Sequence, residues 1–177
     1  MDELSKHFSC IKFPVNDILM NLENLSGIFL PVNKHGGQAK EAIRLLGETY
    51  ASDCQIVYFP AGLCSRKKKG VIRDLKWQKS FISKAVQHKR DIVPCFLSGR
   101  NSEFFYNLAN LRTWLGIKSN FEMLYLPDEM FRQKGKDISL VFGKSIPWQT
   151  FDSKKTPSEW ADWVKVRSYE LESFITK

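Results

Sequence analysis

The residues best suited to chemistry lie in one short turn, the segment FPAGLCSRKKKG at positions 59–70. The apolar run QIVYF leads into its proline, and the chain then presents the hydroxyl of Ser65, the guanidinium of Arg66 and three lysines. A turn that places a hydroxyl and several cations at the end of a buried strand is suited to binding an anion. Serine is also common in turns for structural reasons alone, so that interpretation of Ser65 stays open.

Nucleophilic and metal chemistry have little support in the sequence. It contains no GxSxG motif and no GxxxxGK[ST] loop, and Cys64 has no histidine near it along the chain. The four cysteines form no CxxC pair and do not cluster with the three histidines, so we expect no zinc site. We expect reduced, partly buried thiols, as is usual for a cytosolic protein.

Charge is the most informative bulk property. Lysine and arginine number 27 against 19 acidic residues, a net charge of +8 over 177 residues. This excess suits nucleic acid, an anionic membrane surface or an acidic protein, although the run at 66–69 is equally typical of a solvated surface. The aromatic residues fall at helical core spacing, which argues against nucleic acid. RNA binding through 66–69 stays open, although this spacing disfavours it.

Apolar patterning predicts strands that alternate with helices. Strands are expected at 11–15, 27–32, 55–59, 91–97 and 138–142. Helices are expected at 17–25, 38–50, 75–88 and 101–115, and a last one after Thr156, where Glu159 completes a capping box. This order is typical of an α/β fold with a largely parallel sheet flanked by helices, here as one domain over 1–177. Ligands bind at the carboxyl ends of such strands, where 59–66 lies.

The order of motifs resembles the glycerolipid acyltransferases, the family typified by 1-acyl-glycerol-3-phosphate acyltransferase. FPAGLCSR is followed by GVIRDLKWQKSF and then by AVQHKRDIVPCFLSGRNSEFFYNL, and the resemblance runs from about Ile11 to Trp148. Within this family, the sequence is similar to the bacterial hemolysin-like branch, which includes O-acyltransferases of ornithine- and glycine-containing lipids. The family implies that a lyso-lipid hydroxyl attacks an acyl thioester on acyl carrier protein or coenzyme A. The thioester is a co-substrate, and no cofactor or metal is implied.

The resemblance also implies where substrate binds. The headgroup-binding loop of the family falls on Phe59, Pro60, Gly62, Ser65 and Arg66. A second motif falls on 27–34, with Lys34 where arginine is usual, and another falls on 92–94. Ser65 and Arg66 are expected to hold the anionic group of the acceptor, and Lys34 is expected to assist them.

Two neighbours of the loop, Asp74 and Trp77, belong to the recognisable pattern. We expect them to be structural residues of the junction between the loop and the following helix.

The catalytic box of the family does not occur in this sequence. In the family, the histidine of an H-x-x-x-x-D box removes the hydroxyl proton, and the aspartate orients that histidine. The residues five positions after His7, His35 and His88 are Lys12, Lys40 and Val93. We therefore expect no catalytic residue here, a chain that is incomplete at its N-terminus, and little or no acyl transfer by the chain alone. The alternative is a noncatalytic domain that binds anionic lipid or an acidic protein.

The expected location is cytoplasmic, peripheral on the inner face of a bacterial membrane. No apolar run approaches the roughly 20 residues of a membrane span, and the first ten residues have no apolar region of a signal peptide. The basic surface is expected to contact anionic headgroups and to attract acyl carrier protein.

Overall fold

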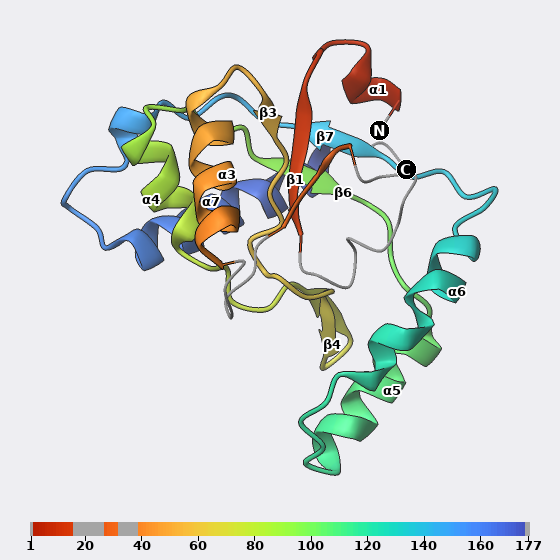
Figure 1. The fold of residues 1–177 in the computed structure, drawn as a ribbon. Coiled ribbons are helices and arrows are strands. Elements are labelled where there is room, and N and C mark those ends of the chain that lie inside the picture. The colour runs from red at the N-terminus through yellow and green to blue at the C-terminus, as the bar shows by residue number, and fades with distance from the viewer. Residues whose placement is uncertain (1, 16–26, 32–38, 176–177) are drawn as a thin grey trace.

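The computed structural model describes residues 2–15, 27–31 and 39–175. These residues form a mixed α/β body and a helical arm that projects from it (Figure 1). The shortest helices are α1 (Asp2–Ser5), η3 (Trp148–Thr150) and η4 (Leu171–Phe174). The helix expected at 17–25 and the site residue Lys34 lie outside the described residues, so both stay predictions.

Three parallel strands form a small sheet. Strand β1 (Ile11–Val15) lies between β2 (Phe29–Pro31) and β3 (Gln55–Ile56), and helix α3 (Ala39–Ala51) lies between β2 and β3 along the chain. The expected α/β class with a parallel sheet is confirmed. The carboxyl end of β3 leads into the turn at 59–66.

The parallel pairing brings two cysteines together. Cys10 and Cys54 each directly precede a strand, and β1 and β3 pair in register from their first residues. The two Cα atoms are therefore only 4.6 Å apart, and the sulfurs form a disulfide. Our expectation of reduced thiols is wrong for this pair, whereas Cys64 and Cys95 are free. Spacing along the chain does not show the pairing, because the two cysteines meet only once the strand register is set.

The basic run folds into a hairpin that the sequence patterning did not predict. Strand β4 (Arg66–Lys68) pairs antiparallel with β5 (Val71–Arg73). The turn between them consists of Lys69 at φ 48° and Gly70 at φ 79°. Two left-handed residues in sequence make the turn whose twist matches that of a hairpin. The three consecutive lysines argue against a strand, because lysine is generally depleted in strands. Sequence patterning therefore missed this hairpin.

A second antiparallel pair joins distant segments. Strand β6 (Cys95–Leu97) pairs with β7 (Leu140–Phe142) and does not join the parallel sheet. Pro94 directly precedes β6, as suits a residue that has no N–H to donate to a strand ladder. The parallel sheet is thus smaller than the strand pattern indicated.

The main core forms where α4 (Ser80–Gln87) packs against α7 (Pro157–Glu170). Its buried residues are Trp77, Phe81, Ile82, Phe151, Trp160, Ala161 and Val164. The apolar stripe predicted for 75–88 supplies the first three of them. The predicted capping box is also confirmed, because Glu159 N donates to Thr156 Oγ1 and Thr156 N donates to Glu159 Oε2. Removal of this apolar surface from water anchors α7 on the body.

The arm consists of α5 (Glu103–Trp114), the short helix η2 (Phe121–Tyr125) and α6 (Leu126–Phe131) (Figure 1). Only one side of α5 is covered, and on the other side the Trp114 side chain is 80% exposed and Leu111 is 52% exposed. The core spacing inferred for the aromatic residues of this helix is therefore wrong at its outer face, because among the described elements β4 and η2 pack against the other side of the helix. No helix within the described ranges combines the length and apolar character that crossing a bilayer requires.

We predict that protein purified without reductant, unfolded and treated with iodoacetamide is alkylated at Cys64 and Cys95 alone. Cys10 and Cys54 are protected because their sulfurs are bonded to each other. Reduction before alkylation should expose all four cysteines, and intact mass spectrometry counts the added groups. Four groups without reduction would contradict the pairing.

Candidate functional site

Backbone contacts fix the turn that follows β3. Gly62 N donates to Phe59 O (3.1 Å), and Gly62 has φ 67°, in the left-handed region that favours glycine. Pro60 O accepts a hydrogen bond from Gln78 N (2.9 Å), which holds the turn against the segment before α4. The Phe59 ring stacks on Phe13 with a centroid distance of 6.1 Å. These three predicted site residues shape the turn, and their contact with a substrate stays a prediction.

Asp74 is the hydrogen-bonding centre of the loop. Ser65 Oγ donates to Asp74 Oδ1 (2.5 Å), and Trp77 Nε1 donates to Asp74 Oδ2 (2.9 Å). The Asp74 backbone is held as well, because its N–H donates to the Tyr169 hydroxyl (2.9 Å) and Lys165 Nζ donates to its carbonyl (2.8 Å). Burial lowers the pKa of Lys165 and raises the pKa of Tyr169. The structural role expected for Asp74 and Trp77 is confirmed.

Arg66 belongs to a buried ion cluster. Its Nη2 lies 2.7 Å from Glu122 Oε1, and its Nη1 donates to Cys64 O (2.9 Å). Arg112 Nε lies 2.9 Å from Glu122 Oε2, in ion-pair contact without the alignment of a hydrogen bond. Glu122 is fully buried, and Arg66 and Arg112 are almost so.

Both members of the predicted anion-binding pair thus have partners inside the protein. Ser65 is bonded to Asp74, and the Arg66 guanidinium is bonded to Glu122. Direct binding of an acceptor anion by these two side chains gains no support from these contacts and stays a prediction.

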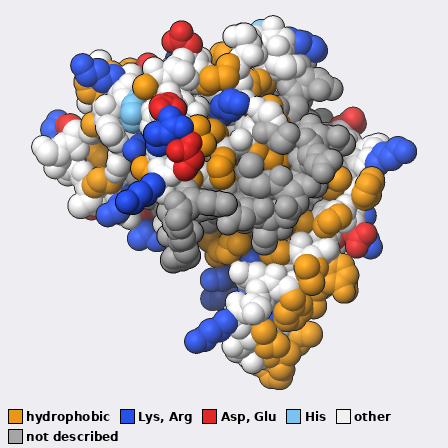
Figure 2. Space-filling model, viewed as in Figure 1, with side chains coloured by type: hydrophobic (Ala, Val, Ile, Leu, Met, Phe, Trp, Pro, Cys, Tyr) orange, Lys and Arg blue, Asp and Glu red, His pale blue; other side chains and the backbone are white. Residues whose placement is uncertain are grey.

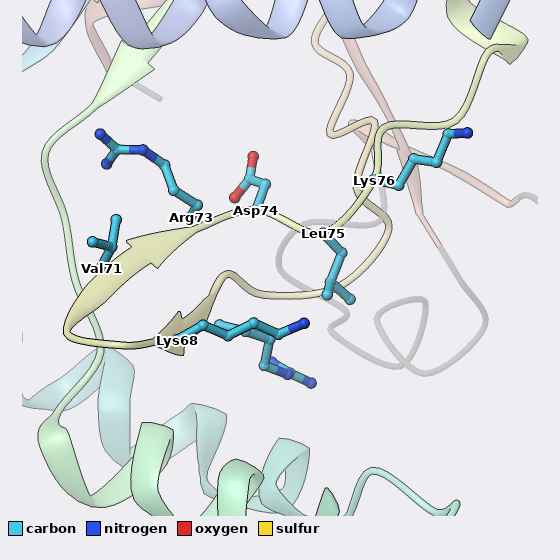
Figure 3. A pocket seen from close by; sticks show the side chains of 7 residues that line it. Lys68, Val71, Arg73, Asp74, Leu75 and Lys76 are labelled. Carbon is cyan, nitrogen blue, oxygen red and sulfur yellow. The ribbon is translucent and has the colours of Figure 1, made fainter.

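One face of the β4–β5 hairpin borders a cleft of about 290 Å³ (Figure 3). The residues that line it are Arg66, Lys68, Val71, Arg73, Asp74, Leu75 and Lys76. Arg66 lies opposite Arg73 and Lys68 lies opposite Val71, so all four side chains share one face of the hairpin. Four lining residues are cations, and the carboxylate of the one acid is already hydrogen-bonded. The cleft therefore attracts anions.

The exposed cations of the cleft differ in how many contacts they make with other residues of the protein. The Arg73 guanidinium lies over the Tyr169 ring (4.6 Å) and 3.5 Å from Glu172. The exposed ammonium groups of Lys68 and Lys76 make no hydrogen bond or ion pair with any residue that the structure describes. These two lysines are available to a ligand, and they were not among the predicted site residues. Lys68 could have been identified if 66–68 had been predicted as a strand, because residues two apart in a strand share a face. The run of lysines gave no strand pattern.

The described part of the site has the features of a binding site and shows no general base. No histidine lines the cleft, and His88 stacks on Tyr50 (5.4 Å) at the end of α4. Burial lowers the pKa of His88, and burial raises the pKa of the Cys64 thiol, which is therefore a poor nucleophile. Among the described residues, no group of His, Cys, Asp or Glu is arranged to hold a metal ion.

We predict that Glu122→Gln lowers the free energy of unfolding by about 3 kcal/mol, because it leaves two buried arginines without a counter-charge. Urea unfolding followed by circular dichroism measures the loss. Glu103→Gln is the matched control: Glu103 pairs with Lys67 of the same hairpin at 2.6 Å, but its side chain is 64% exposed. The control should lose much less stability, and equal losses would contradict the role of the buried cluster.

Comparison with known proteins places this geometry in a family. The acyltransferase family model matches residues 1–176. A lyso-glycine lipid O-acyltransferase of Bacteroides thetaiotaomicron is 53% identical over 169 residues, which cover 95% of this chain and 62% of that protein. A protein of the same name from Phocaeicola vulgatus is 49% identical over 169 residues, 95% of this chain and 61% of its own. The chain thus spans less than two thirds of the length of these curated relatives.

A solved structure shares the fold. The crystal structure of the 1-acyl-sn-glycerophosphate (LPA) acyltransferase PlsC from Thermotoga maritima is similar with a TM-score of 0.50. The similarity covers 94% of this chain and 59% of that chain, and at 17% identity it shows the fold alone. The resemblance inferred from FPAGLCSR and the motifs behind it is confirmed, and the chain belongs to the acyltransferase family.

Proposed function

We propose that these residues form the acceptor-binding part of an O-acyltransferase of bacterial membrane lipid synthesis. The enzyme moves an acyl chain from a thioester on acyl carrier protein or coenzyme A to the hydroxyl of a lyso-lipid. The printed names of the two relatives make a lyso-glycine lipid the first candidate acceptor. The observation that carries the proposal is the cationic cleft formed by the hairpin that follows the FPAGLCSR motif.

The cleft suits a headgroup with a negative charge. A glycine headgroup attached through its nitrogen presents a carboxylate, and the ammonium groups of Lys68 and Lys76 have no ion-pair partner among the described residues. Val71 and Leu75 line the same cleft and add apolar surface for the adjoining part of the lipid. In this proposal Arg66 adds its charge to the cleft while it holds the hairpin in place.

The proton of the attacking hydroxyl needs a base. The acceptor oxygen bonds to the thioester carbonyl carbon, the C–S bond breaks, and a base passes the hydroxyl proton to the leaving thiolate. The 177 residues contain no H-x-x-x-x-D box, so we assign the base to a segment that carries this box and completes the site. The chain alone then binds the acceptor and transfers little or nothing.

The enzyme works peripherally at the inner, cytoplasmic face of the membrane in this proposal. The net charge of +8 supports contact with anionic headgroups, at about 1 kcal/mol per well-placed cation, and with acidic acyl carrier protein. A noncatalytic domain that binds anionic lipid or an acidic protein is the second candidate, and the absence of the box from these residues favours it.

We predict that the 177-residue chain gives no measurable transfer from acyl carrier protein to lyso-glycine lipid. Fusion behind an H-x-x-x-x-D segment from an active member of the family should produce the diacyl product, which mass spectrometry detects. The same fusion with the histidine of that box replaced by alanine is the control. Robust transfer by the chain alone would contradict the proposal that the catalytic base lies in another segment. A folded but inactive fusion that still binds lyso-lipid would favour the noncatalytic alternative.

The double substitution Lys68→Gln and Lys76→Gln should weaken binding of lyso-glycine lipid about tenfold or more, because it removes two exposed cations from the cleft. Isothermal titration calorimetry below the micelle concentration measures the affinity. Lys40→Gln with Lys144→Gln removes the same charge from exposed positions outside the cleft. Equal weakening in the two double variants would mean that net charge, and not the cleft, binds the headgroup.

A further inference from the structure

The helical arm carries an exposed apolar face (Figure 2). Its most exposed large side chains are Leu111, Trp114, Leu115, Leu124, Met130 and Phe131. Figure 2 shows hydrophobic side chains gathered along the arm and not scattered singly. A gathered group of large apolar side chains marks an interaction surface. We use the term apolar face for these six residues.

The apolar face belongs to an arm that is firmly held on its other side. The buried Glu122 ties η2 to the hairpin through Arg66. The Glu129 carboxylate of α6 accepts hydrogen bonds of 2.5 Å from Ser102 N and from Ser102 Oγ, at the start of α5. The rings of Phe104 and Tyr125 contact each other at 5.2 Å and join α5 to η2. The arm therefore presents its apolar face in a fixed orientation.

Cations lie beside this face. The β4–β5 hairpin packs on α5, because Lys67 Nζ lies 2.6 Å from Glu103 and Asn110 Nδ2 donates to Lys67 O (3.1 Å). The exposed Lys68 and Lys69 of the hairpin are thereby held next to the arm. The exposed Lys118 follows α5 at the arm tip. Cations that flank an apolar face are complementary to anionic headgroups that flank hydrocarbon.

We propose that the apolar face inserts into the interfacial layer of an anionic bilayer, with the hairpin lysines on its headgroups. Aliphatic side chains and Met make up most of the face, and they suit hydrocarbon better than nucleic-acid bases, which stack on aromatic rings. Trp114 is of the residue type that bilayer interfaces favour. The inference rests on the proposed function: strand β4 packs on the arm and also lines the cleft, so insertion brings the cleft to a lipid acceptor in the same leaflet.

Vesicle binding by substituted proteins tests the proposal. The arm variant carries Trp114→Ser and Leu124→Ser, both at side chains that are about four-fifths exposed, 80% and 79%. The control carries Ile43→Ser and Phe174→Ser, which are 66% and 71% exposed and lie outside the arm. Sedimentation with vesicles of phosphatidylcholine, with and without phosphatidylglycerol, measures partitioning. Thermal unfolding by circular dichroism checks that both variants keep the stability of the parent.

The parent protein should bind the mixed vesicles more tightly than phosphatidylcholine alone, and added salt should weaken this binding. The arm variant should lose about tenfold or more in partitioning, whereas the control should change less than about twofold. Equal losses in both variants, or a parent protein that does not sediment with vesicles, would overturn the proposal. So would gel filtration that shows a dimer of the parent and a monomer of the arm variant, since a second copy would then cover the face.

The proposed function is tested separately by calorimetry with dispersed lyso-glycine lipid, which requires no bilayer. The arm variant should bind this lipid as the parent does, because Trp114 and Leu124 do not line the cleft. Lyso-lipid binding without arm-dependent vesicle binding would contradict the membrane inference but not the proposed function. Arm-dependent vesicle binding without lyso-lipid binding would contradict the proposed function but not the membrane inference.

Discussion

The site depends on one buried carboxylate that two arginines share. Glu122 comes from η2, Arg66 from the first strand of the hairpin and Arg112 from α5, so a single group joins three elements. Burying such a cluster has a large desolvation cost, and packed apolar residues often stabilise a protein as well or better. Ion pairs add orientational specificity, because a guanidinium and a carboxylate bind each other best in a few relative orientations. The cluster therefore sets the angle at which the hairpin meets the arm.

A second carboxylate, that of Asp74, holds the loop through other partners. Asp74 accepts hydrogen bonds from Ser65 and Trp77 and is itself held by α7 through Tyr169. Asp74 is hydrogen-bonded and Glu122 is ion-paired with two arginines, so the charge left exposed along the hairpin face is positive. These two acids thus hold a short, lysine-rich hairpin in place as one wall of a cleft.

Local signals in the sequence predicted much of the fold. The stripe through Trp77, Phe81 and Ile82 and the cap at Thr156 depend only on neighbours within a turn or two of helix, and both were found as expected. Of the motif at 59–66, Arg66 alone is among the residues that line the cleft, and substrate binding by the motif stays a prediction.

The rest depended on contacts between distant segments. The partner of Arg66 lies 56 positions away, and the link between Cys10 and Cys54 exists only through strand register. The outer face of α5 has apolar spacing but no partner, so periodicity alone predicted burial at Trp114 where the arm leaves it exposed.

The bond between Asp74 N and the Tyr169 hydroxyl joins residues 95 positions apart, and this has a consequence during translation. Glu122 follows Arg66 by 56 positions, so the nascent chain can close the arginine cluster first. At about 5–20 residues per second, the ribosome releases α7 several seconds later. Until then the loop lacks the hydrogen bond between Asp74 N and the Tyr169 hydroxyl, so the arginine cluster can form before α7 holds the loop.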